Sequence, residues 1–158
     1  MSPYKVVWRE QSSQFQAARV ASDGGKIVIP DHKLMAVSCS SLLEADYLTA
    51  LLSSSICKLL VVSYVLSTST STHVLDHIAI PRYEPKDSMH KTLSTLSNRC
   101  HEAVAQGETE AVASIELEID RLAAQIWGVT KQELDLIQRA LEALDQPRQQ
   151  RDTIDREE

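Results

Sequence analysis

The sequence predicts an α+β protein in which a small mixed β-sheet region and a long helix precede a C-terminal helical hairpin or bundle. Three observations predict this order. Short β-branched and aromatic segments fill the first 40 residues, an apolar face with helical spacing follows at residues 48–60, and further helical stripes close the chain. Strands and helices do not alternate, so a parallel sheet of repeated β–α–β units is not expected.

Four strands are predicted ahead of the long helix. They span residues 5–9, 15–20, 26–30 and 34–39, and an Asp-Gly-Gly turn signal separates the second from the third. Ser41 and Glu44 have the spacing of a capping box, which marks a helix start. For the end of this segment, residues 61–65, periodicity favours neither helix nor strand.

The middle of the chain predicts a loop and one more strand. Residues 67–72 alternate serine and threonine and lack the apolar content to pack, so an exposed loop is expected. Residues 73–80 predict a strand that Pro81 ends at the margin of the sheet.

From Asp87 onward the pattern is helical. Gly107 and Gly128 are natural helix stops, and a second capping box begins at Thr130. The apolar stripes on either side of Gly128 predict an antiparallel helical hairpin. The charged, apolar-poor residues from Asp145 onward are expected to fray.

Composition and charge limit the possible partners. With 158 residues and 43% hydrophobic content, the chain is long and apolar enough for a folded core. Residues 1–101 hold 10 Lys/Arg and 8 Asp/Glu, whereas residues 102–158 hold 6 and 14, which together give the net charge of −6. A nucleic-acid surface is therefore expected in the first part.

Location and redox state are inferred from the same composition. The first residues lack a charged leader followed by an apolar stretch, and the longest apolar region contains Glu44, Asp46 and Lys58. The odd number of cysteines, none in a Cys-x-x-Cys pair, favours reduced thiols. A cytoplasmic protein without a membrane span is expected.

Three blocks, in their order and spacing, carry a resemblance to a known family. They are Ala45–Ser55, His77–Pro81, and Ile126–Thr130 together with Glu133 and Ile137. This order resembles the C-terminal specificity domain of adenine-N6 DNA methyltransferases of restriction–modification systems, similar to the TaqI and Eco57I enzymes. Related half-domains occur in type I restriction specificity subunits. Ser54 stands where the family usually has asparagine.

The resemblance implies a strand-rich target-recognition region at residues 1–86, a C-terminal helical region at 87–145 and a flexible charged tail at 146–158. The family's Asn-Pro-Pro-Tyr motif and Gly-rich turn for S-adenosylmethionine are missing from the sequence, and no two of its five prolines are adjacent. The implied function is recognition of double-stranded DNA for a catalytic methyltransferase domain or subunit that binds S-adenosylmethionine. The parent protein is then a site-specific DNA adenine methyltransferase, alone or fused to an endonuclease.

Six basic residues of the strand-rich region are the candidates for DNA contact, because Lys and Arg neutralise phosphates and bind guanine edges. They are Lys5, Arg9, Arg19, Lys26, Lys33 and Arg82. The polar loop at residues 11–14 is a further candidate for base contact. The Ser/Thr run at 67–72 is either a phosphate-contacting loop or a solvated linker. Trp8 is expected in the core rather than at the interface.

Other chemistry is less favoured by the sequence. His73 and His77 suggest a metal pair only on a helix, whereas in a strand they lie about 13 Å apart, so no metal site is expected. Cys57 lies on an apolar helix and is expected to be a core thiol rather than a nucleophile. An alternative function is a protein-interaction or assembly module of a restriction–modification complex that makes no direct DNA contact.

Overall fold

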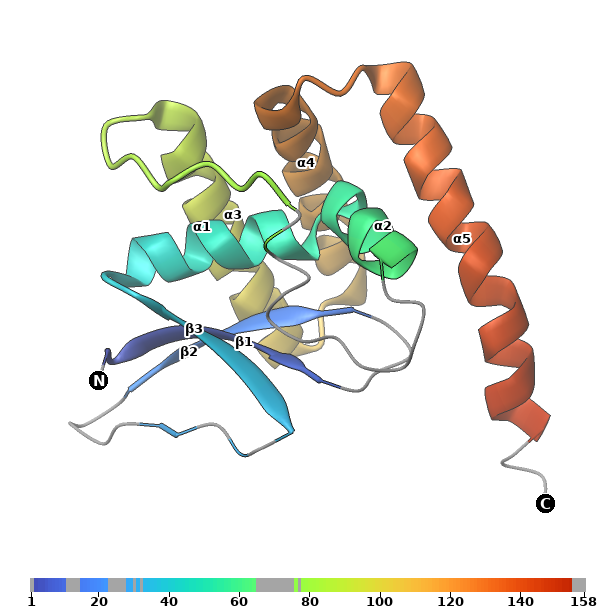
Figure 1. Cartoon of the computed structure of the whole chain (residues 1–158), viewed down its shortest axis with the longest axis horizontal. Coiled ribbons are helices and arrows are strands. Elements are labelled where there is room, and N and C mark those ends of the chain that lie inside the picture. The colour runs from blue at the N-terminus through green and yellow to red at the C-terminus, as the bar shows by residue number, and fades with distance from the viewer. Residues whose placement is uncertain are drawn as a thin grey trace.

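The computed structural model describes residues 2–10, 15–22, 28–29, 31, 33–64, 76 and 78–154, without the side chains of residues 64 and 145–154. The described chain is α+β, which confirms the predicted fold class. Strands β1 (Tyr4–Arg9), β2 (Ala17–Ala21) and β3 (Leu34–Cys39) precede helices α1 (Leu42–Ser53), α2 (Ser55–Tyr64), α3 (Ser88–Gln106), α4 (Thr109–Trp127) and α5 (Lys131–Ile154). Figure 1 shows the helices gathered on one side of the small sheet.

The described sheet is entirely antiparallel rather than mixed. Its strand order is β2-β1-β3, with Tyr4 opposite Ala21 on one side and opposite Cys39 on the other. Three of the four predicted strands are confirmed. The fourth, at residues 26–30, lies largely outside the described residues, and Val28 and Ile29 belong to no strand.

Helix α1 lies between two cores. On one side it packs on the sheet, where Val6, Trp8 and Leu52 belong to one buried cluster. On the other side Tyr47 and Leu51 belong to a second cluster with α3 and α4. Burial on two sides explains why α1 is apolar around most of its circumference rather than along one stripe.

The predicted long helix is interrupted at Ser54. The Ser54 hydroxyl donates to the Leu51 carbonyl and accepts from the Cys57 amide, so it ends α1 and starts α2. The two axes differ in direction by 63°. Helix α2 continues to Tyr64, which settles residues 61–64 as helix.

The helix ends follow the predicted caps. The Ser41 hydroxyl accepts from the Glu44 amide at 3.1 Å, and the Thr130 hydroxyl accepts from the Glu133 amide at 3.3 Å. Gly107 and Gly128 end α3 and α4 with φ of 74° and 67°, the left-handed region that glycine enters without strain.

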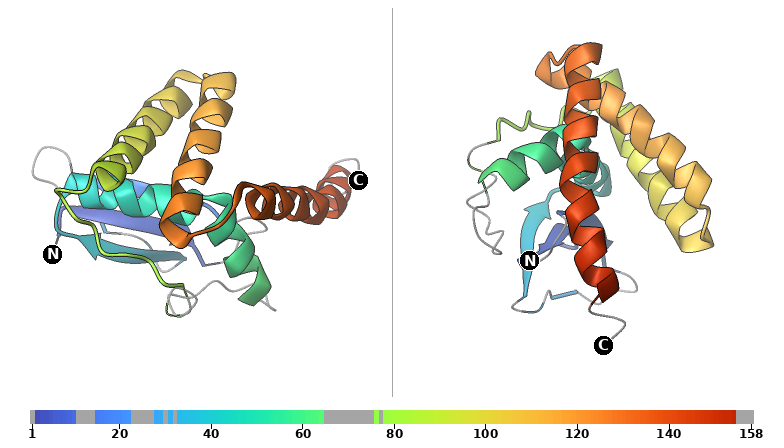
Figure 2. Two further views of the ribbon diagram at one scale, coloured as in Figure 1. Left: turned by 90° about the horizontal axis from the view of Figure 1, so that it is seen from above. Right: turned by 90° about the vertical axis from the view of Figure 1, so that its right-hand side faces the viewer.

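Two predictions for the later chain are wrong. Residues 78–80 are not a strand, and neither is Asp76, while residues 73–75 and 77 lie outside the described residues. The helices on either side of Gly128, α4 and α5, do not pack closely together as the predicted hairpin requires. Instead α4 packs along α3, and α5 packs chiefly on α2. Figure 2 shows α3 and α4 as a projecting pair, with α5 set apart from them.

Helix α5 continues to Ile154, past Asp145 where the charged tail was expected to fray. Within the described part of the chain, no single helix has the length and apolar composition to cross a membrane. Only the sharply bent pair of α1 and α2 meets both criteria.

Candidate functional site

Two of the six predicted DNA-contacting cations are bound inside the protein. Lys5 is 4% exposed, and its ammonium donates to the carbonyls of Ser2 and Val28, both at 2.9 Å. The Arg19 guanidinium lies 3.0 Å from the Asp46 carboxylate and donates to Asn98 Oδ1 at 2.8 Å. Acceptors within the protein bind both charges, so Lys5 and Arg19 stabilise the fold. Their positions do not favour the predicted contact with DNA.

Arg9 and Lys33 are exposed at the same end of the sheet. Arg9 is the last residue of β1 and pairs with Leu34, and the Glu10 amide donates to the Lys33 carbonyl at 3.0 Å. Arg82 is also exposed but lies in the segment between α2 and α3. Lys26 lies outside the described residues. The structure therefore brings Arg9 and Lys33 together and separates them from Lys5, Arg19 and Arg82.

The remaining predicted candidates have a simple outcome. The polar loop at 11–14, the Ser/Thr run at 67–72, His73 and His77 lie outside the described residues. Trp8 is 2% exposed and packs near the Phe15 ring, as expected for a core residue. Among the described residues no cluster of ligands could hold a metal. Burial raises the pKa of the Cys57 thiol to about 12, which makes it a poor nucleophile.

The three sequence blocks of the resemblance meet in space. Tyr47, from the first block, donates its hydroxyl hydrogen to the Pro81 carbonyl of the second at 3.1 Å. Trp127, from the third block, donates its indole N–H to the Ala79 carbonyl of the second at 2.8 Å. Residues 78–81 of the second block are thus held between α1 and the end of α4, although they form no strand.

A buried polar network joins β2, α1 and α3. Asp46 is 2% exposed, and burial raises the pKa of its carboxyl to about 6, against the opposing effects of Arg19 and a hydrogen bond from Ser97. The His101 ring bonds the backbone carbonyl of Arg19, and burial, with a smaller effect of the Arg19 charge, lowers the pKa of the ring. The network therefore holds ionisable groups that burial biases toward their neutral forms.

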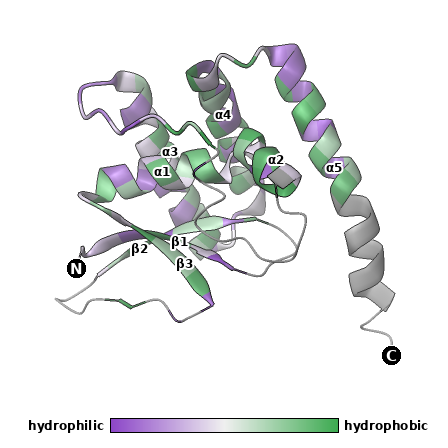
Figure 3. Ribbon diagram, in the orientation of Figure 1, coloured by the Kyte–Doolittle hydropathy of each residue, from purple (hydrophilic) through white to green (hydrophobic). Residues whose placement is uncertain are grey.

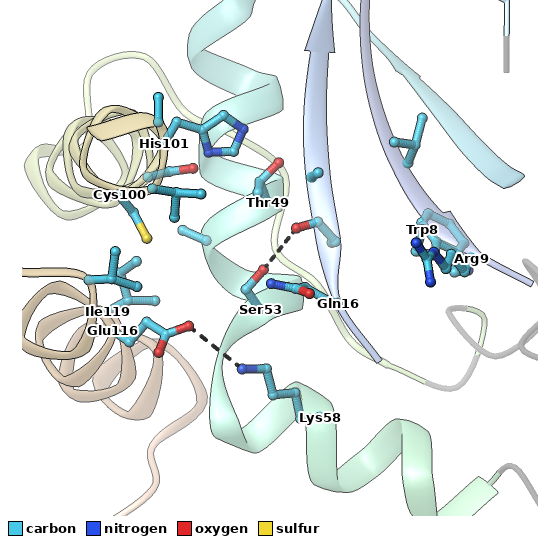
Figure 4. Close-up of a pocket in the computed structure, with 18 of the residues that line it drawn as sticks. Trp8, Arg9, Gln16, Thr49, Ser53, Lys58, Cys100, His101, Glu116 and Ile119 are labelled. Carbon is cyan, nitrogen blue, oxygen red and sulfur yellow. Dashed lines mark hydrogen bonds and ion pairs between the residues drawn. The ribbon is translucent and has the colours of Figure 1, made fainter. Parts of the chain in front are cut away.

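Beside this network lies a hollow of about 680 Å³ along β2. Figure 4 shows Thr49, Ser53 and His101 around it, with Trp8 and Arg9 on the far side of β2. At the end toward α2, the Lys58 ammonium and the Glu116 carboxylate lie 3.9 Å apart. The lining thus combines hydroxyl groups, an imidazole, the paired charges of Lys58 and Glu116, and the Arg9 guanidinium.

Sequence reasoning missed Asp46, Thr49 and His101 as a group. The available signal was Asp46 itself, a carboxylate inside an apolar helical segment. A buried charge needs a partner, so its presence predicted a cation or hydroxyl on a neighbouring element. Which element supplies that partner depends on tertiary packing.

Comparisons with known proteins give no relative: no family model matches the chain, and neither curated proteins nor solved structures include a significant match.

Proposed function

We propose that this chain recognises the DNA target of a cytoplasmic, S-adenosylmethionine-dependent adenine-N6 methyltransferase of a restriction–modification system. Chemistry and cofactor binding belong to a catalytic methyltransferase domain or subunit outside this sequence. The contact between the three sequence blocks, through Tyr47 and Trp127, is the observation that carries the proposal. Residues on which the family resemblance rests form one connected framework, as expected if they support a shared fold.

The proposed DNA contact is the end of the sheet where Arg9 and Lys33 are exposed. These cations can reach phosphates without losing an internal partner, whereas Lys5 and Arg19 would each give up buried bonds. Residues 102–158, with 6 basic and 14 acidic residues, would be repelled by a duplex. DNA is therefore expected to approach the sheet end and to avoid α4 and α5.

Fluorescence anisotropy with a mixed-sequence duplex at increasing salt tests this contact. Arg9→Ala/Lys33→Ala should weaken binding and reduce the slope of log affinity against log salt by about 2, because about 0.9 counterions are released per phosphate contact. The matched control is Lys91→Ala/Arg121→Ala, which removes two exposed cations from α3 and α4. The proposal would be contradicted if wild-type affinity did not depend on salt, or if both double variants gave the same slope of log affinity against log salt.

An assembly module remains the second candidate, because large apolar side chains are exposed on α4 and α5. Leu117, Leu136 and Leu144 are 48%, 63% and 42% exposed, and Figure 3 shows apolar positions interspersed with polar ones along α5. Exposed leucines in an acidic region suit a partner with apolar and basic groups. Leu136→Lys/Leu144→Lys would abolish assembly with the methyltransferase subunit in this case. DNA binding that survives Arg9→Ala/Lys33→Ala would favour this candidate.

A further inference from the structure

The hollow along β2 has the dimensions of a small-molecule site. Its volume of about 680 Å³ lies within the usual range of roughly 300 to 1,000 Å³ for ligand pockets. Apolar side chains of α3 and α4, among them Cys100, Val112 and Ile119, form one wall, opposite the hydroxyl-bearing face of α1 and the start of β2. The lining thus offers an apolar surface and hydrogen-bonding groups to one ligand.

Thr49 supplies an unused hydrogen-bonding group in this hollow. It is only 4% exposed, and its hydroxyl has no hydrogen-bond partner among the described residues. A buried hydroxyl normally bonds the protein or water, because leaving it unpaired costs about 1 to 3 kcal/mol. The hydroxyl oxygen exposes less than 1 Å², so a ligand in the hollow provides the missing partner only if the Thr49 side chain turns toward it.

His101 lies at the same level of the hollow as Thr49. Successive turns of α1 and α3 lie opposite each other. The Ser94 hydroxyl donates to the Leu43 carbonyl, and Ser97 bonds Asp46 one turn later. One further turn brings Thr49 to the level of His101. Figure 4 shows both residues at the same end of the hollow.

The protonation of His101 determines what this pair can bind. Burial lowers the pKa of the ring, so the imidazole is neutral at neutral pH. Its one N–H is used by the backbone carbonyl of Arg19, which leaves the second ring nitrogen as an acceptor. Thr49 can donate its hydroxyl hydrogen. The two residues therefore present one donor and one acceptor with no net charge.

We propose that the hollow binds a small uncharged molecule that joins an apolar body to an amide-type head. The N–H of the head donates to His101, and its carbonyl accepts from Thr49. The apolar body lies against Cys100 and Ile119. At the opposite end Lys58 and Glu116 neutralise each other and add no preference for a charged ligand. Arg9 also lines the hollow, but it lies on the far side of β2 from Thr49 and His101, so this residue is shared with the proposed DNA contact.

Four benzene derivatives that differ only in the head group test the chemistry: benzamide, benzoate, benzylamine and toluene. Each is titrated into the ¹⁵N-labelled full chain, and NMR shift changes give the affinity and the location. Benzamide can bond both Thr49 and His101, so it is expected to bind about a hundredfold more tightly than toluene, roughly tenfold for each bond. The two charged compounds are expected to bind more weakly than benzamide. No shift changes around the hollow, or equal binding of benzamide and the charged compounds, would overturn the proposal.

Two variants establish that Thr49 is responsible. Thr49→Val should reduce benzamide affinity about tenfold, because it removes one of the two proposed hydrogen bonds. It should leave toluene binding and stability unchanged or improved, because the hydroxyl has no partner to lose. Thr95→Val is the matched control: Thr95 is exposed on α3 and bonds the Lys91 carbonyl. Ala105→Trp, at the exposed rim, should block both ligands. Full benzamide affinity in Thr49→Val or in Ala105→Trp would overturn the proposal.

Discussion

Two buried aspartates, Asp46 on α1 and Asp120 on α4, have very different surroundings. Asp120 accepts from the Ser55 amide at 2.7 Å, the Ser55 hydroxyl at 2.6 Å and the Gln138 side-chain amide at 2.8 Å. Asp46 faces one cation, Arg19, at 3.0 Å, together with Ser97. Both residues are 5% exposed or less.

The difference distinguishes a carboxylate that stabilises the fold through several hydrogen bonds, Asp120, from one whose protonation can change near pH 6, Asp46. Asp120 lies at the N-terminus of α2, where unpaired amides and the helix dipole favour an anion, and it thereby holds the bend between α1 and α2. Asp46 lacks such a set of donors, and burial raises its pKa. The incomplete cluster is also the one beside the hollow.

The largest expected effect is the loss of Asp120. Asp120→Ala leaves the Ser55 amide without its acceptor and uncaps α2, so the free energy of unfolding should fall by about 4 kcal/mol. Urea unfolding followed by circular dichroism measures this. Asp135→Ala, which removes an exposed carboxylate from α5, is the control and should change stability little. A loss below about 1 kcal/mol for Asp120→Ala would remove the contrast between the two aspartates.

Next in size is the pH dependence due to Asp46. Its folded pKa of about 6 lies above the ordinary 3.8, so the folded state holds the proton more tightly and stability is lost as pH rises from about 4 to about 6. The difference corresponds to at most about 3 kcal/mol. Asp46→Asn cannot titrate, so the gap between its unfolding free energy and that of the wild type isolates this effect. If the wild type instead gains stability relative to Asp46→Asn over this range, the Arg19 ion pair dominates and the pKa is lowered.

The smallest expected effect comes from removing one neutral side chain beside each aspartate, Gln138 beside Asp120 and Asn98 beside Asp46 and Arg19. Gln138→Ala removes one of three donors to Asp120 and should cost about 1 kcal/mol. Asn98→Ala removes the bond from Arg19 and an exposed bond to Glu102, but Arg19 keeps its contact with Asp46. This variant should therefore cost less than Gln138→Ala. Thermal unfolding of the two variants side by side ranks them. The reverse ranking would place the tighter network around Asp46.

Local signals made much of the fold predictable. Strand composition identified β1, β2 and β3, and short-range capping patterns located the start of α1, the stops at Gly107 and Gly128, and the start of α5. These features succeed because their partners lie within a few residues of each other.

The features that sequence reasoning missed involve partners far apart in the sequence. The bend at Ser54 is held by Asp120, which bonds Ser55 across 65 residues. Lys5 is internal because the Val28 carbonyl reaches it, and Arg19 because Asp46 and Asn98 do. No local sequence pattern contains these contacts. Buried and exposed cations could therefore not be distinguished from the sequence, and no sequence pattern predicted the hollow beside Thr49.

Hydrogen–deuterium exchange with and without duplex DNA tests the proposed recognition surface most directly. DNA is expected to slow exchange in peptides covering the end of β1 and the start of β3, around Arg9 and Leu34, and to leave α4 and α5 unchanged. Slower exchange confined to α4 or α5, or no change anywhere at low salt, would contradict recognition of DNA by the end of the sheet.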